Sequence, residues 1–132
     1  MKIIGIDPGI NKLGYGVIEE NYKILKCGVF VPSSKLSYEN KVDYLLKNFK
    51  NLLKEYSPDL VSIEEIYVAK NVQIALKMGI IIGSIIWASL SNNIKYFLIP
   101  PREIKLLITG NGGATKEQVK FMVENLTGYY SF

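Results

Sequence analysis

The segment IIGIDPG (residues 3–9), followed by LGYGVI (residues 13–18), decides how the rest of the chain is arranged. The apolar run at residues 3–6 predicts a buried central strand, and residues 13–18 predict its neighbour. Pro8, Gly9 and Asn11 predict a tight turn between the two strands. Gly14 and Gly16 have no side chains, so another backbone or a phosphate could approach the second strand closely at these positions.

Asp7 stands where the first strand ends. A charge at the end of a core strand costs free energy unless another group pairs with it. Two explanations remain open on this residue alone. The side chain either caps the following turn, as Asp before Pro-Gly often does, or it holds a divalent metal ion.

The composition restricts the chemistry that the chain can perform. Its 132 residues, 48% of them apolar, are enough for one globular domain. Histidine is absent and Cys27 is the single cysteine, which excludes Ser/His and Cys/His triads, an internal disulfide and a cysteine zinc site. Acid–base or metal chemistry must therefore rest on carboxylates, lysines or tyrosines.

The charge balance is mildly basic, with a net charge of +4 at pH 7. All of the 16 basic residues except Arg102 are lysines, which suits a polyanionic partner but is equally typical of a solvated surface. Met1 and Lys2 lead directly into the first strand, so we expect no signal peptide and a cytoplasmic protein. The longest uncharged apolar run, residues 78–90, is shorter than the ~20 residues of a membrane span, and we expect no membrane partner.

The periodicity predicts an α/β domain with a mixed five-stranded sheet flanked by helices. Strands at residues 2–7, 13–19 and 23–31 form a meander. A helix capped by Ser37 ends at Ser57-Pro58, and a strand follows at 60–63. A helix at 71–91, a strand at 95–99, a short helix beginning at Pro101 and a last helix between Thr115 and Gly128 complete the order. Helical crossovers make the later strands parallel to the first.

The helix from Asn71 to Ser91 is apolar almost all round in its second half, which predicts burial on more than one side. Gly79 and Gly83 lie one turn apart and permit close backbone approach. The helix is either a central core helix, or it packs one face on the domain and another on a second copy of the chain. The small size of the domain favours the second copy.

Two strands end in a carboxylate, Asp7 and Glu64. If these strands lie side by side and parallel, both side chains meet at the sheet edge where α/β proteins bind ligands. Two bare carboxylates repel each other unless a cation lies between them. Mg²⁺ suits this pair because it prefers oxygen ligands. A carboxylate cluster without histidine indicates two-metal phosphodiester hydrolysis, with the two ions ~3.5–4 Å apart.

Several residues near this edge are candidate DNA contacts. Tyr67 could stack on an unpaired base, and Lys116 stands at a helix N-terminus, where backbone N–H groups favour phosphate. The full set of candidates is Tyr67, Lys70, Asn71, Arg102, Lys105 and Lys116. Taken singly, Tyr67 could instead be a core aromatic residue, and the lysines could be ordinary surface charges.

The motifs GIDPG (5–9), GYGVI (14–18), IEEIYVAKN (63–71) and ALKMG (75–79) closely resemble the RuvC family of Holliday junction resolvases. Lys105 and the segment TKEQV (115–119) also match in order and spacing. The resemblance covers essentially all of the chain. GIDPG alone is a weak signal, because sugar kinases and actin-like ATPases open similarly, but its combination with IEEIYVAKN at this separation is specific.

The resemblance implies an RNase H-like fold and symmetric Mg²⁺-dependent nicking of four-way DNA junctions in recombination and repair, with two Mg²⁺ per active site. It implies that Asp7 and Glu64 are the first two catalytic carboxylates and that Tyr67 is the aromatic residue that stacks on junction bases. It also implies that Lys105 and Lys116 are needed for cleavage.

The resemblance further implies a homodimer formed through the helix from Asn71 to Ser91, because two sites related by a two-fold axis match a junction with the same symmetry. It implies a branch-migration helicase complex as a further partner.

One departure from the family pattern affects the site. The family carries two more aspartates on a C-terminal helix beyond residue 132, and Glu65 and Glu124 are poor substitutes by position. We therefore expect a single nuclease domain, residues 1–132, that lacks the family's C-terminal segment, binds metal weakly and cuts poorly. Two alternatives are a catalytically impaired module that binds branched DNA, and an actin-like ATPase fragment. The latter would need a second nucleotide-binding subdomain, for which this chain has no room.

Overall fold

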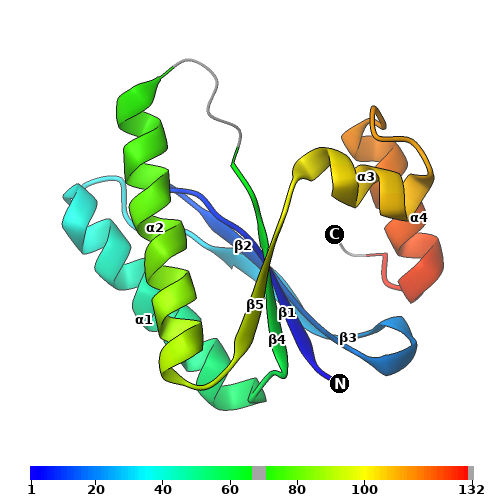
Figure 1. The fold of residues 1–132 in the computed structure, drawn as a ribbon, viewed down its shortest axis with the longest axis horizontal. Helices are drawn as coiled ribbons and strands as arrows, with labels where there is room; N and C mark the ends of the chain where they lie inside the picture. Colours follow the sequence, from blue (N-terminus) through cyan, green and yellow to red (C-terminus); the bar gives the residue numbers. More distant parts are fainter. Residues whose placement is uncertain (67–70, 131–132) are drawn as a thin grey trace.

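The computed structural model describes residues 1–66 and 71–130 and contains one mixed sheet with helices on both sides (Figure 1). The strands are β1 (Ile3–Asp7), β2 (Leu13–Glu19), β3 (Lys23–Phe30), β4 (Leu60–Glu64) and β5 (Lys95–Ile99). The helices are α1 (Tyr38–Tyr56), α2 (Val72–Ser91), α3 (Pro101–Thr109) and α4 (Lys116–Thr127), with a short 3₁₀ turn, η1 (Glu20–Tyr22), in the first hairpin. The predicted element order and α/β class are confirmed, with boundaries within about two residues.

The sheet has the strand order β3-β2-β1-β4-β5. The pairs β1–β2 and β2–β3 are antiparallel, whereas β1–β4 and β4–β5 are parallel. The predicted meander and helical crossovers are thus both present. The arrangement places β1 at the centre of the sheet, with the C-terminal ends of β1, β4 and β5 at the same edge.

The hydrophobic core lies between the sheet and the α1–α2 layer, on the left of Figure 1. Alternate residues of the strands, such as Ile4 and Val61, are fully buried there against Phe49 of α1 and Ile85 of α2. This alternation follows from the period of two along a strand, which turns every second side chain to the same face.

The helix boundaries match the local signals in the sequence. Ser37 caps α1 through a hydrogen bond from the Asn40 amide, and Ser57 ends the helix in a left-handed conformation with φ 44°. Pro101 occupies the first turn of α3, and Gly128 ends α4 with φ 71°. These signals act within a few residues, which is why the sequence alone predicts them.

Helix α2 is only partly covered in the described chain. Ile81, Ile82 and Ile85 are buried against the domain, but Trp87 is 71% exposed. In the described chain, α2 is therefore not a core helix that is covered on all sides. By length and hydropathy this one helix would also pass as a candidate membrane span. Its buried face against the sheet and α1 is typical of an amphipathic domain helix.

Candidate active site at the carboxyl edge of the sheet

The two predicted carboxylates lie side by side. Asp7 is the last residue of β1 and Glu64 is the last residue of β4, and the parallel register pairs Ile6 with Ile63 immediately before them. The two carboxyl groups lie close enough for Asp7 to raise the pKa of Glu64 through its charge and through hydrogen bonding. The predicted meeting of two strand-end carboxylates is therefore confirmed.

The turn after Asp7 is held in place by close packing. A Cβ at Gly9 would collide with the carbonyl oxygen of Lys12, so this turn requires glycine. The amine of Lys41 on α1 donates a hydrogen bond of 2.8 Å to Oδ1 of Asn11 in the same turn. Gly14 lies opposite Asp7 in the sheet register, and a Cβ there would lie in ordinary contact, 3.4 Å from that of Asp7.

The surroundings of Glu64 shift the pKa of its carboxyl group in opposite directions. Partial burial raises the pKa of the Glu64 carboxyl group above its ordinary value, and the charge of Asp7 and the hydrogen bond with it raise that pKa further. The charges of Lys105 and Lys116 act in the opposite direction. A cation between the two carboxyl groups would offset their mutual repulsion.

A cavity of about 590 Å³ opens beside the two carboxylates. Its wall combines the ends of β1 and β4 with one face of α3 and one face of α4. The lining residues are Asp7, Glu64, Pro101, Ile104, Lys105, Lys116, Val119, Lys120 and Val123. Acidic side chains from the sheet thus face lysines from the helices across a single opening.

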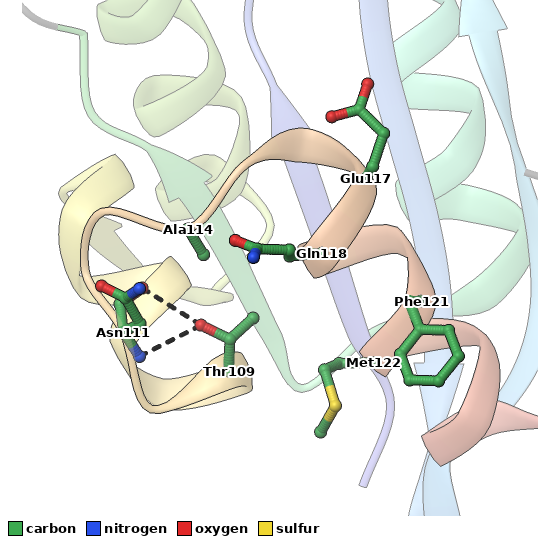
Figure 2. A pocket seen from close by; sticks show the side chains of 7 residues that line it. All are labelled: Thr109, Asn111, Ala114, Glu117, Gln118, Phe121 and Met122. Atoms are coloured by element: carbon green, nitrogen blue, oxygen red, sulfur yellow. Dashed lines mark hydrogen bonds between the residues drawn. The ribbon is translucent and has the colours of Figure 1, made fainter.

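The loop between α3 and α4 fixes where Lys116 begins its helix. Thr115 accepts a hydrogen bond from the Gln118 amide, and the Gln118 side chain accepts one from the Thr115 amide, which completes the predicted capping box. The Thr109 hydroxyl bonds the backbone of Asn111, as Figure 2 shows, and tightens the turn that leads there. The cap therefore sets the position of Lys116 in the first turn of α4.

A second cavity of about 620 Å³ covers the face of the sheet opposite the core. Its lining includes the small residues Gly5, Gly16 and Ser62 as well as Ile104 and Tyr129, and Asp7 and Glu64 line this cavity too. Tyr129 also hydrogen-bonds Cys27, which raises the pKa of the tyrosine. Tyr129 is partly buried, because the chain returns to the sheet after α4.

The other predicted DNA contacts either do not line the carboxylate cavity or lie outside the described residues. Arg102 lies against the backbone of Gly112, where an added Cβ would be 2.9 Å from Cγ of the arginine, and it does not line the carboxylate cavity. Asn71 caps α2 by accepting a hydrogen bond of 3.2 Å from the Ile74 amide. Tyr67 and Lys70 lie outside the described residues.

Lys120 was not among the sequence-based candidates, although it lines the same cavity as Asp7 and Glu64. Its position four residues after Lys116 on one helix was the signal that could have found it. Within residues 1–66 and 71–130, no cluster of three or more Asp, Glu, Cys or His side chains could hold a metal ion. Asp7 and Glu64 supply hard oxygen donors of the kind that Mg²⁺ prefers, but only two of them.

Comparison with known proteins agrees with this arrangement. The profile of the family described as crossover junction endodeoxyribonuclease RuvC matches residues 3–129. The RuvC protein of Chlorobium phaeovibrioides is 40% identical over 130 residues, covering 96% of this chain and 69% of the relative. The RuvC protein of Thermosipho melanesiensis is 40% identical over 129 residues, covering 96% of this chain and 82% of the relative.

A solved structure described as T. thermophilus RuvC in complex with Holliday junction substrate superposes with a TM-score of 0.90 at 27% identity, covering 98% of this chain and 81% of that one. A ROK hexokinase from Thermus thermophilus, at 16% identity and a TM-score of 0.51, shares the fold alone. RuvC proteins and sugar kinases thus share an opening strand and turn because they share a fold. The match over nearly the whole length of this chain is to RuvC. This chain belongs to the RuvC family of crossover junction endodeoxyribonucleases, with their RNase H-like fold.

Proposed function

We propose that this protein is a structure-selective endonuclease that resolves four-way DNA junctions by hydrolysing phosphodiester bonds. The observation that carries the proposal is the carboxylate pair Asp7–Glu64 at the carboxyl edge of the sheet, facing Lys105 and Lys116 across one cavity. A phosphodiester entering the cavity would meet lysines that offset its charge and carboxylates that can hold a cation beside it. Membership in the RuvC family supports the same reaction and substrate.

The proposal includes Mg²⁺ held by Asp7 and Glu64, with two ions per site in the complete catalytic centre. Bound Mg²⁺ would activate water and stabilise the leaving oxygen. The raised pKa of Glu64 supports this role, because approach of a cation relieves the repulsion between the two carboxyl groups. The prediction of further carboxylates from beyond residue 132, and of weak metal binding by residues 1–132, stays a prediction.

We further propose that the protein works as a homodimer, with α2 at the interface between the two copies. Leu76, Ile80, Gly83, Trp87 and Leu90 are all exposed and recur at alternating spacings of four and three residues, the pattern of a helix seam that packs on another helix. We name these five residues the α2 seam. A second copy packed on the α2 seam would bury this surface and relate two active sites by a two-fold axis.

A catalytically impaired module that binds branched DNA is the second candidate function. It is favoured by one observation, namely that the described residues supply only two carboxylates at the site. The lysines around the cavity would serve DNA binding in either case. A branch-migration helicase as a further partner, a cytoplasmic location and the roles of Tyr67, Lys70, Asn71 and Arg102 in DNA binding remain predictions.

The decisive experiment compares binding of a synthetic four-way junction with binding of linear duplex of the same arm sequences. A gel shift in Ca²⁺ at fixed salt measures both affinities without cleavage, because phosphate contacts make affinity steeply salt-dependent. We expect a clear preference for the junction. Equal affinity for both DNAs would contradict the proposed substrate. Replacing Ca²⁺ with Mg²⁺ then separates the candidates, since only the nuclease nicks the bound junction.

A further inference from the structure

One face of α4 is turned toward the carboxylate pair. Lys116, Val119, Lys120 and Val123 line the cavity that contains Asp7. These positions recur at spacings of three, one and three residues, which places them on one side of a helix. Lys120 is therefore part of the wall of the proposed active site, although no sequence motif identifies it.

The acidic residue of the first turn of α4 points elsewhere. Glu117 lines a different cavity, of about 460 Å³, together with Phe121 and Met122, and Figure 2 labels these side chains around it. The surface that α4 contributes to the carboxylate cavity is thus made of lysine and valine only. This surface suits a phosphate and does not offset the lysine charges.

Lys120 is available for a ligand. Its side chain is exposed, and it forms no ion pair with any side chain of residues 1–66 and 71–130. Lys105 and Lys116 are close enough to lower the pKa of Glu64. Lys120 lies one turn further along α4, a step of about 6 Å along the helix axis, and it lines the same cavity without being among the groups that shift the pKa of Glu64.

We propose that Lys120 binds the phosphate next to the scissile one on the cleaved strand and so sets the register of that strand in the active site. The inference rests on the proposed function, because it assumes that the scissile phosphate lies at Asp7 and Glu64. A strand crossing the cavity would meet Lys116 and Lys120 in succession, with one phosphate for each ammonium group. Lys120 is a positioning residue for the reaction, not a group that takes part in bond breaking.

The test is the salt dependence of DNA binding in Ca²⁺ for the unaltered chain, Lys120→Gln and Lys120→Arg. Each phosphate contact contributes about 0.9 to the slope of log affinity against log salt concentration. We expect the slope of Lys120→Gln to fall by roughly one and that of Lys120→Arg to stay unchanged. Lys54→Gln, which removes an exposed charge from the last turn of α1, is the matched control and should keep the full slope.

The outcomes separate the inference from the function on which it rests. An unchanged slope for Lys120→Gln, an equal fall for Lys54→Gln, or a failure of arginine to substitute for Lys120 would overturn the role of Lys120. Equal binding of junction and duplex by the unaltered chain would instead overturn the proposed substrate, while the three slopes can still be compared on duplex. Thermal unfolding of each variant checks that the fold is intact.

Discussion

At the scale of single residues, the site depends on a pair of carboxyl groups that the fold brings together against their mutual repulsion. Glu64 is partly removed from water and lies beside Asp7, and both influences raise its pKa. Such an arrangement costs folding free energy and is kept where the groups serve a ligand. The two residues should therefore respond to substitution in a way that ordinary surface acids do not.

Asp7→Asn should abolish Mg²⁺-dependent nicking of a four-way junction and preserve or strengthen binding of that junction. The substitution removes a metal ligand and also removes a negative charge that faces phosphate. Nicking is measured in Mg²⁺ and binding by gel shift in Ca²⁺. Asp43→Asn, at an exposed acid of α1 that pairs with Lys47, should leave both unchanged. Nicking by Asp7→Asn at the rate of the unaltered chain would refute the assignment of Asp7.

Glu64→Gln should raise the thermal unfolding temperature at about pH 7 and have little effect at about pH 3.5. The folded state raises the pKa of Glu64, so its contribution to stability is most favourable below the unfolded pKa of ~4.3 and is lost as the pH rises through the folded value. Glutamine stays neutral and avoids this loss. Calorimetry at the two pH values measures the difference, and a shift of the same size at both would contradict the explanation.

At the scale of elements, α2 carries two different apolar faces. One face packs Ile81 and Ile85 against the domain, and the other, the α2 seam, is exposed in the described chain. A helix with apolar residues on both faces is stable in water when a partner covers the second face. The proposed homodimer would cover this second face.

Trp87→Lys should convert the proposed dimer into a monomer, because a charged side chain would have to be buried within the α2 seam. Trp87 is 71% exposed in the described chain, so the substitution should leave the fold of each copy intact. Sedimentation equilibrium measures the mass of the assembly. Val31→Lys, at an exposed apolar residue just after β3, should retain the dimer. A monomeric unaltered chain at micromolar concentration would show that the α2 seam has another role.

At the scale of the whole molecule, one core supports the carboxylate edge. β1 and β4 end in the catalytic candidates, and the same strands bury Ile4 and Val61 against α1 and α2. The positions of the two carboxylates therefore depend on residues that lie in the core and not at the site.

Phe49→Ala should destabilise the fold by about 3–5 kcal/mol, because it leaves a cavity at a fully buried position of α1. Denaturant unfolding followed by circular dichroism gives the free energy of unfolding. Phe97→Ala, at a 57% exposed position of β5, should cost much less. Similar losses for the two variants would mean that the core does not lie between the sheet and α1.

Features that depend on neighbouring residues could be predicted from the amino-acid sequence. The capping box of α4, the Ser37 cap and the strand–turn–strand that contains Asp7 were all predictable, since each is stabilised within a few residues. The meeting of Asp7 with Glu64 was also predictable, because a right-handed helical crossover returns the chain to a parallel neighbour.

Which surface residues share a site became apparent only from the packing of the folded chain. Lys120 lines the carboxylate cavity and Arg102 does not, although both are basic and lie on the last two helices. Tyr129 returns to the sheet, and the α2 seam stays uncovered. The physical reason is that the rotation of a helix about its axis and its angle to the sheet arise from packing between segments far apart in the sequence, which local patterns do not encode.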